Sequence, residues 1–371
     1  MNIIIVNAFE TYELRSDLLA QTMKEAGHSV CIYQSDFLHR EKVTRTDQKD
    51  GVRFFHADPY ARNMSWQRAH SHAKLSRRIF DAVAASAQGI DMLWVLAPPN
   101  SFVKDAAAVK KQFPHIKLVY DLIDLWPESI PVPHLKNIWP FTQWGKMRNS
   151  GLSCADYVVT ECSLYQKVLK KYLSAEKAAT LYWARPDAKI TPHLKQDKDC
   201  LSLCYLGSIN NLIDIPVIGA IIRDLSEMWP VRLHVIGDGE KRDELLQEAA
   251  RAGAEVQFHG KIYDANKKQE IFDQCHFGLN IMKPMVCVGL TMKSMNYFEV
   301  GLPVINNIRG DTWDFVAEEK IGLNYSGNQK LIVPELPGPE SHENVLRFYK
   351  DTLSLSIFKK NVNTILSRMM Q

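Results

Sequence analysis

A turn followed by a helix pattern carries the best-defined anion-binding chemistry of this sequence. Residues Gly289 to Lys293 run directly into apolar residues at helical spacing. The free backbone N–H groups and the positive dipole end at such a helix start attract phosphate. Thr291 and Met292 are expected at that start, where Lys293 would add a compact cation. The alternative for Lys293 is an ordinary solvated lysine.

Glycine turns follow two apolar strand patterns. Gly207 and Ser208 come after Leu201–Leu206, and Gly237 comes after Val231–Ile236. A glycine lets the backbone approach a phosphate closely, although a plain strand-end turn also needs glycine for a positive φ. Open parallel sheets bind ligands outside the carboxyl ends of their strands, so these turns are candidate binding positions.

Several familiar motifs are absent from the sequence. The turns after Asn7, Leu206 and Ile236 lack the GxGxxG pattern of dinucleotide binding. There is also no GxxxxGKS/T, HExxH or GxSxG pattern. These absences argue against a nicotinamide enzyme and against a P-loop ATPase.

The elements that must position these turns fall into two similar halves. Apolar strand runs alternate with helical patterns from residue 2 to about 173, a polar linker follows near 184–200, and the alternation restarts at Leu201. Strands alternating with helices predict a parallel sheet covered on both faces. The expected fold class is α/β, with two tandem Rossmann-like doubly wound domains facing across a cleft. Two ligands held opposite one another would suit the transfer of a group between substrates.

The composition is that of an ordinary globular protein. Of 371 residues, 46% are hydrophobic and 23% charged, and the net charge is +3. This near balance of charge argues against a nucleic-acid partner. Apolar runs fall short of the roughly 20 residues of a membrane-spanning helix, and no signal-peptide pattern is present. The seven scattered cysteines indicate reduced thiols, so the expected location is the cytoplasm.

Ordered motifs in both halves resemble those of a known family. They are Ala97–Pro99, Asp121–Ser129, Ala155–Ser163, Val235–Glu240, Val256–Lys261 and Lys293–Ile305. Together they resemble the retaining GT-B glycosyltransferases, the family 4-like group of bacterial polysaccharide biosynthesis. Each motif alone is weak, whereas their order and spacing are specific and cover nearly the whole chain.

The resemblance implies that the second half binds a nucleotide diphosphate sugar. Lys293, at the family's lysine position, would stabilise the diphosphate leaving group. Asn296 would bind the ribose hydroxyls, with a helix-packing asparagine as the alternative. Gly237 would lie at the nucleoside, and backbone groups of Lys261 and Ile262 would face the base edge.

The retaining mechanism that the resemblance implies needs no protein nucleophile, because the departing phosphate oxygen can accept the acceptor's proton on the same face. No cofactor and no metal ion are expected. Asp197-Lys-Asp199 has the DxD form of metal-dependent transferases, but it falls in the charged linker and is interpreted as chance.

The first half would bind the acceptor. Asp124 follows the strand pattern Leu118–Tyr120 and would position an acceptor or sugar hydroxyl. The alternative is that Asp124 caps the turn before Pro127. Glu10 and Glu13 lie in the first strand-to-helix turn, where acceptor contacts and an ordinary helix-start acid are equally plausible.

Two departures from the family bear on activity. Many members have a Glu-x7-Glu motif, where this chain has valine and Asn296, and many have a basic pair just after the strand that matches Leu201–Leu206. Without these groups, the diphosphate would depend on Lys293, on helix dipoles, and on Lys283 or Arg15.

Residues 59–80 hold five cations and no acid. The five cations are Arg62, Arg68, Lys74, Arg77 and Arg78. Such a face is usually solvated. On an enzyme for lipid-linked sugars this face would instead rest on anionic headgroups. Each cation near the surface would then add about 1 kcal/mol to the free energy of membrane binding. A peripheral position at the inner face of the membrane is therefore the second interpretation of this stretch.

The sequence thus predicts a metal-independent glycosyltransferase that moves a hexose, expected to be UDP-linked, to a glycan or lipid-linked hydroxyl in surface polysaccharide synthesis. The expected domains are residues 1–185 for the acceptor, 186–345 for the nucleotide sugar, and 346–371 as a helix packing back toward the first domain. A nucleotide-sugar 2-epimerase of the same fold and a non-catalytic partner subunit of another glycosyltransferase remain alternatives, and a homo-oligomer is left open.

Overall fold

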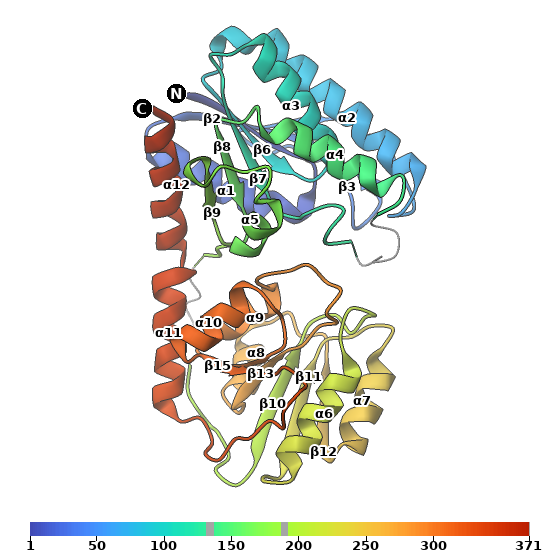
Figure 1. Cartoon of the computed structure of the whole chain (residues 1–371), viewed down its shortest axis with the longest axis vertical. Coiled ribbons are helices and arrows are strands. Elements are labelled where there is room, and N and C mark those ends of the chain that lie inside the picture. The colour runs from blue at the N-terminus through green and yellow to red at the C-terminus, as the bar shows by residue number, and fades with distance from the viewer. Residues whose placement is uncertain (131–136, 187–191, 371) are drawn as a thin grey trace. The chain divides into compact units, whose positions relative to one another are not determined.

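Two parallel sheets, each in its own unit, organise the chain (Figure 1). The computed structural model describes residues 1–130, 137–186 and 192–370. The first unit combines Met1–Arg185 with Leu355–Gln371, and the second unit is Pro186–Ser354. The part of the polar linker at 187–191 lies outside the described residues.

The first sheet has the strand order β5-β2-β1-β6-β7-β8-β9, with every neighbouring pair parallel. Its strands are β1 (Asn2–Asn7), β2 (Ser29–Ser35), β5 (Val52–Phe55), β6 (Met92–Ala97), β7 (Lys117–Leu122), β8 (Tyr157–Thr160) and β9 (Ala178–Thr180). The central strands β1, β6 and β7 are almost entirely buried, which explains why their sequences are continuous apolar runs.

Helices cover the first sheet, and a short hairpin follows β2. The helices are α1 (Glu13–Glu25), α2 (Trp66–Ala85), α3 (Asn100–Gln112), α4 (Phe141–Leu152), α5 (Ser163–Leu169) and α12 (Leu355–Met370), and the hairpin pairs β3 (Phe37–Leu38) with β4 (Val43–Thr44). Ser65 caps α2 by accepting a hydrogen bond from the Arg68 backbone N–H, which fixes where this long helix begins.

The second sheet has the order β12-β11-β10-β13-β14-β15 and is also parallel throughout. Its strands are β10 (Leu201–Leu206), β11 (Val231–Ile236), β12 (Ala254–Gly260), β13 (Phe277–Asn280), β14 (Val304–Asn306) and β15 (Gly322–Asn324). Its helices are α6 (Ile215–Ser226), α7 (Arg242–Arg251), α8 (Ala265–Phe272), α9 (Met292–Glu299), α10 (Asp311–Glu319) and α11 (Pro339–Thr352). The strand order reverses at β10, whose neighbours are β11 and β13.

The C-terminal tail is divided between the two units. α11 belongs to the second unit, whereas α12 packs on α1 of the first. Lys359 of α12 forms an ion pair with Glu25 of α1 at 2.7 Å, and Arg368 donates to the Tyr157 hydroxyl at 2.7 Å. The units therefore divide after Ser354 rather than at the expected residue 345.

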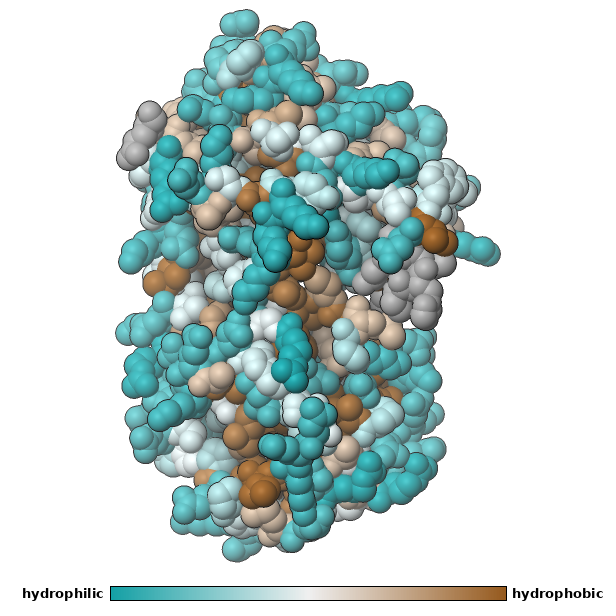
Figure 2. Space-filling view, in the orientation of Figure 1, coloured by the Kyte–Doolittle hydropathy of each residue, from teal (hydrophilic) through white to brown (hydrophobic). Residues whose placement is uncertain are grey.

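Hydrophilic residues dominate the face of the molecule that Figure 2 shows, with hydrophobic residues in small scattered groups. No helix among the described residues combines the length and the apolar character needed to cross a bilayer.

Candidate functional site

The carboxyl ends of β10, β11 and β12 meet at one edge of the second sheet. Gly207 follows β10 with φ +117°, and Gly237 follows β11 with φ +148°. A Cβ on Gly237 would lie 1.9 Å from the Gly207 carbonyl oxygen, so only glycine fits where these two turns touch. The Gly237 N–H donates to the Gly260 carbonyl at 2.8 Å, which brings in the end of β12 and, directly after it, Lys261 and Ile262.

Lys293 lies against the first of these turns. A Cβ on Gly207 would be 3.7 Å from Lys293 Cε. Lys293 Nζ donates to the Tyr205 hydroxyl at 3.1 Å and lies 4.2 Å from the centroid of the same ring. Burial lowers the pKa of Lys293 to about 8. An ammonium group that is desolvated and bonded to a neutral phenol gains strongly from an anionic partner.

The start of α9 is built by a capping box. Thr291 Oγ1 accepts from the Ser294 N–H at 3.0 Å, and the Thr291 N–H donates to Ser294 Oγ at 3.3 Å. These two bonds use the first and fourth N–H groups of the helix start. No hydrogen bond within the described residues uses the N–H groups of Met292 and Lys293. Thr291 therefore shapes this helix start with a committed hydroxyl, and the next two backbone N–H groups are the ones that a ligand can reach.

Three asparagines hold the loop that leads into α9, and the sequence analysis did not find them. Asn280, Asn306 and Asn324 end β13, β14 and β15. Asn280 Nδ2 donates to Asn306 Oδ1 at 2.9 Å, and Asn306 Nδ2 donates to Asn324 Oδ1 at 2.8 Å. Thr291 Oγ1 donates to Asn280 Oδ1 at 2.7 Å, which ties the helix start to this ladder. The sequence did contain a signal for them, because each asparagine is the last residue of one of three neighbouring strands.

The remaining predicted residues of the second unit lie nearby with exposed or locally bonded side chains. Asn296 Nδ2 donates to the Met292 carbonyl one turn back on α9. Ser208 is exposed, and its carbonyl accepts from the Tyr205 hydroxyl at 2.8 Å. Lys261 is exposed, and Ile262 is half-buried. The roles predicted for Asn296, Lys261 and Ile262 toward ribose and base stay predictions.

Arg15, which was considered for this site, and the DxD string, which was interpreted as chance, both lie away from it. Arg15 is fully buried in the first unit, where it pairs with Asp121 at 2.8 Å and also donates to the Leu181 carbonyl. The expectation that Arg15 serves a diphosphate is therefore wrong, because its charge is already neutralised in a core. Asp197 and Asp199 precede β10, at the amino end of the second sheet, opposite the strand-end turns.

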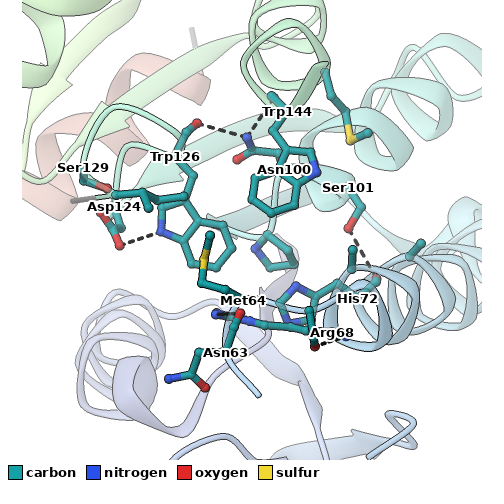
Figure 3. Close-up of a pocket in the computed structure, with 16 residues that line it drawn as sticks. Asn63, Met64, Arg68, His72, Asn100, Ser101, Asp124, Trp126, Ser129 and Trp144 are labelled. Atoms are coloured by element: carbon teal, nitrogen blue, oxygen red, sulfur yellow. Dashed lines mark hydrogen bonds between the residues drawn. The ribbon is translucent and has the colours of Figure 1, made fainter. Parts of the chain in front are cut away.

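A cavity of about 270 Å³ opens in the first unit at the carboxyl ends of β6 and β7 (Figure 3). Arg68 and His72 of α2 form one wall, and Asn100 begins α3 beside them. Asp124 and Trp126, which follow β7, lie across from α2. The cavity is therefore assembled from segments that are far apart in the sequence.

Asp124 is one of two acidic groups at neighbouring strand ends. Asp124 Oδ2 accepts from Trp126 Nε1 at 2.8 Å. Burial raises the pKa of the Asp124 carboxyl, which the hydrogen bond from Trp126 opposes. Glu161 follows β8, and burial together with the Asp124 charge raises its pKa well above the ordinary value. The structure thus places Asp124 where a carboxyl group can meet a ligand hydroxyl, and it adds Glu161, which the same strand-end argument would have found.

Glu10 and Glu13 are committed to local structure. The two oxygens of Glu10 accept from the His39 and Arg40 N–H groups at 2.8 and 2.6 Å. Glu13 accepts from Arg45 at 2.6 Å. These carboxylates therefore anchor the segment after β2, and neither lines the cavity of the first unit.

The five cations of residues 59–80 do not form one free face. Arg68 lines the cavity. Lys74 and Arg78, one helical turn apart, both pair with Asp58 at 2.7 and 3.1 Å, so an acid just outside the counted stretch neutralises part of it. Arg62 and Arg77 are exposed.

Comparison with known proteins agrees with this geometry. Residues 202–334 match the family model Glycosyl transferases group 1. No curated protein sequence matches the chain. The chain is similar to the solved structure of Anabaena HepE in complex with UDP, with TM-score 0.64 and 13% identity over 99% of this chain and 100% of that one.

Two further solved structures have the same fold. A Burkholderia vietnamiensis α,α-trehalose-phosphate synthase (UDP-forming) gives TM-score 0.66 at 12% identity, covering 100% of both chains. The apo form of the lipopolysaccharide outer core galactosyltransferase WaaB gives TM-score 0.61 at 14% identity, covering 98% of this chain and 95% of that one. The chain therefore has the GT-B glycosyltransferase fold. The residues that match the group 1 glycosyltransferase model lie within its second unit.

Proposed function

We propose that this glycosyltransferase moves a hexose from a UDP-sugar to a hydroxyl of a glycan or lipid-linked acceptor, with retention, in surface polysaccharide synthesis. The observation that carries the proposal is the half-buried Lys293 ammonium beside the Gly207 turn, together with the N–H groups of Met292 and Lys293 at the start of α9, which no hydrogen bond within the described residues uses. A diphosphate supplies the negative charge that this arrangement lacks. HepE in complex with UDP or UDP-glucose supports the choice of nucleotide.

Lys293 has two tasks in this proposal. It binds the diphosphate in the ground state, and it stabilises the further negative charge that develops on the leaving phosphate as the sugar bond breaks. The N–H groups of Met292 and Lys293 act in the same direction through the dipole of α9. Because these groups supply positive charge at the phosphates, the transfer is proposed to need no metal ion, and a chelator should leave the rate unchanged.

Asp124 is proposed to bind the acceptor on the first unit. Its Oδ2 accepts from Trp126 Nε1, and the carboxyl group lines the cavity of the first unit, where it can accept a hydrogen bond from an acceptor hydroxyl. In a retaining transfer the departing phosphate oxygen takes the proton of that hydroxyl, so Asp124 orients the hydroxyl and no protein nucleophile is required.

A nucleotide screen with matched variants tests the proposal. UDP and UDP-sugars should raise the melting temperature of the full chain more than the other nucleoside diphosphates do. Lys293→Met should abolish most of that increase and of sugar transfer, whereas Lys267→Met, which removes an exposed lysine of α8, should change neither. Stabilisation by UDP that is equal in the Lys293→Met variant would contradict the proposal.

One observation favours a second candidate, a non-catalytic partner subunit. Asn296 stands where many family members have an acid, and its side-chain N–H bonds to its own helix. Such a subunit would bind UDP without turning over any UDP-sugar. Release of UDP from a UDP-sugar by the purified chain excludes this candidate, and binding without release supports it. Formation of an epimer from a UDP-sugar in the absence of an acceptor would instead identify a 2-epimerase.

Peripheral contact with an anionic membrane is also proposed. Arg62 and Arg77 remain exposed on or next to α2. Trp66, at the start of α2, is 62% exposed and packs on Trp139, which is 64% exposed, with ring centroids 5.3 Å apart. Tryptophan favours the headgroup region of a bilayer, and arginine is attracted to anionic lipid. Replacing Trp66 and Arg62 should reduce sedimentation with phosphatidylglycerol vesicles, and unchanged sedimentation would refute this contact.

A further inference from the structure

One wall of the cavity in the first unit carries positive charge that no carboxylate pairs with among the described residues. Arg68 Nη1 donates to the Asn63 backbone carbonyl at 2.9 Å. Lys42 Nζ donates to the Asn63 side-chain oxygen at 2.6 Å and lies 3.3 Å from His39 Nδ1. All of these partners are neutral groups. Arg68 and Asn63 line the cavity, and Lys42 reaches it through Asn63. The charges of Asp124 and Glu10 act on Arg68 and Lys42 through space, without forming an ion pair with either cation.

Aromatic rings partly desolvate this charge. The Arg68 guanidinium carbon lies 4.7 Å from the Trp126 ring centroid and 5.7 Å from that of Phe9. Lys42 Nζ lies 4.7 Å from the Tyr60 centroid. Burial lowers the pKa of both Arg68 and Lys42. Because charges attract more strongly where water is displaced, an anion that enters here binds more tightly than it would at an open surface.

Buried polar atoms on the same wall lack hydrogen bonds. His72 is 7% exposed and lines the cavity beside Arg68 (Figure 3). His72 Nε2 and Arg68 Nε are both buried without a hydrogen-bond partner. Unsatisfied buried polar groups are rare in native proteins and are costly. The lysine bond to the Asn63 oxygen also leaves the Asn63 amide nitrogen to donate elsewhere.

The facing wall has the opposite hydrogen-bonding character. Asn100 Nδ2 donates to the backbone carbonyls of Trp126 and Trp144 at 3.1 and 2.8 Å, which leaves its oxygen as an acceptor. The Asp124 carboxyl group also lines this wall as a hydrogen-bond acceptor. The Trp126 and Trp144 rings are stacked at 6.4 Å, and both line the cavity. Stacked indoles beside acceptor oxygens suit the apolar face and the hydroxyls of a sugar ring.

We infer that this cavity binds a sugar that carries an oxyanion, either a carboxylate or a phosphate monoester. The oxyanion faces Arg68, Asn63 and His72, and the sugar hydroxyls face Asp124 and Asn100. The two oxygens of Glu10 hold backbone N–H groups, and its charge acts on Lys42 through space without an ion pair between the two side chains. This inference rests on the proposed function and specifies it: the acceptor is an acidic glycan rather than a neutral one.

Ligand-observed NMR titrations of the full chain test the inference, since they measure the weak affinities of single sugars. The probes are glucuronate, glucose 6-phosphate, glucose and inorganic phosphate. At least one acidic sugar should bind about tenfold or more tightly than glucose and inorganic phosphate, and this preference should shrink at high salt. Tighter binding of glucuronate would identify the oxyanion of the ligand as a carboxylate, and tighter binding of glucose 6-phosphate would identify it as a phosphate.

Variants assign the effect to the positive wall. Arg68→Met should reduce the affinity for the acidic sugar about tenfold, to that of glucose, and Lys42→Met should reduce it severalfold. Arg77→Met removes an exposed cation from the same helix and should change nothing. The inference is overturned if the wild type shows no preference for either acidic sugar up to about 10 mM, if inorganic phosphate binds as tightly, or if both wall variants keep the preference.

The same samples separate this inference from the proposed function. UDP-induced stabilisation should persist in Arg68→Met, because UDP is assigned to the second unit. Binding of an acidic sugar without any response to UDP would refute the proposed donor and leave the cavity inference standing. Stabilisation by UDP without a preference for acidic sugars would refute the cavity inference and leave the proposed donor standing.

Discussion

Raising the pH should weaken UDP binding through a single side chain, Lys293. Burial sets the pKa of Lys293 at about 8, against an ordinary value of about 10.4. The difference corresponds to roughly 3 kcal/mol of desolvation that opposes the charged form. A bound diphosphate gives the ammonium an anionic partner and raises its pKa again, so UDP binding and lysine protonation are linked.

The size of the effect follows from the fraction of protonated lysine. At pH 7 about nine-tenths of Lys293 is charged, and at pH 9 about one-tenth, so the UDP affinity should fall about tenfold over this range. Lys293→Arg keeps its charge throughout and should show a much smaller fall. Lys293→Met should bind UDP about 10- to 100-fold more weakly than the wild type at pH 7, without the lysine-dependent fall.

Calorimetric titrations of UDP at pH 7, 8 and 9 and constant ionic strength measure these affinities. Ionisation of UDP itself changes the UDP affinity of the wild type and of both variants equally, so it cancels when their affinities are compared. The reasoning is refuted if the wild type and Lys293→Arg lose affinity in parallel, or if Lys293→Met binds as tightly as the wild type at pH 7.

Four further results are expected. Without ligand, Lys293→Met should be more stable than the wild type at pH 7 by up to about 3 kcal/mol in urea unfolding, because a lysine with a lowered folded-state pKa destabilises the fold at low pH. This difference should shrink as the pH rises from about 8 toward 10.4, and a constant difference would contradict the assigned pKa. Arg15→Met leaves Asp121 buried without its cation and should cost about 3–5 kcal/mol in urea unfolding, and a loss below about 1 kcal/mol would contradict a desolvated pair. Thr291→Val removes the α9 cap, so it should lower the free energy of unfolding by about 1 kcal/mol and weaken UDP binding. Thr291→Ser keeps the capping hydroxyl and should keep the wild-type stability and UDP affinity. Equal behaviour of the two variants would exclude the cap. Asp124→Asn should lower the transfer rate about 10- to 100-fold with unchanged UDP affinity, and an equal loss of UDP binding would contradict its placement on the acceptor side.

The alternation of strands and helices could be predicted because most central strands are continuous apolar runs. β10 and β11 lie where the sequence placed them, and β7 contains the expected Leu118–Tyr120. β5 and β9 were missed, since Val52–Phe55 contains a charged residue and Ala178–Thr180 is only three residues long. Such short edge strands are specified by pairing with a neighbour more than by their own composition.

The site was predictable where it depends on strand ends and not where it depends on packing between distant segments. Gly207, Gly237 and Lys293 were all expected at the carboxyl edge of the second sheet, and the structure brings them together. Arg68 belonged by its spacing to a solvated helix face, yet α2 lies against Phe9 and Trp126, so its guanidinium lines a cavity. Contacts between residues nearly sixty positions apart leave no periodic signal in one sequence.

The central claim is that the second unit grips a diphosphate between Lys293 and the start of α9. The most direct measurement is a crystal structure of the full chain with UDP. The account predicts phosphate oxygens within hydrogen-bonding distance of Lys293 Nζ and of the Met292 and Lys293 N–H groups, next to the Gly207 turn. A UDP bound elsewhere, with Lys293 Nζ still bonded to Tyr205 alone, would contradict it.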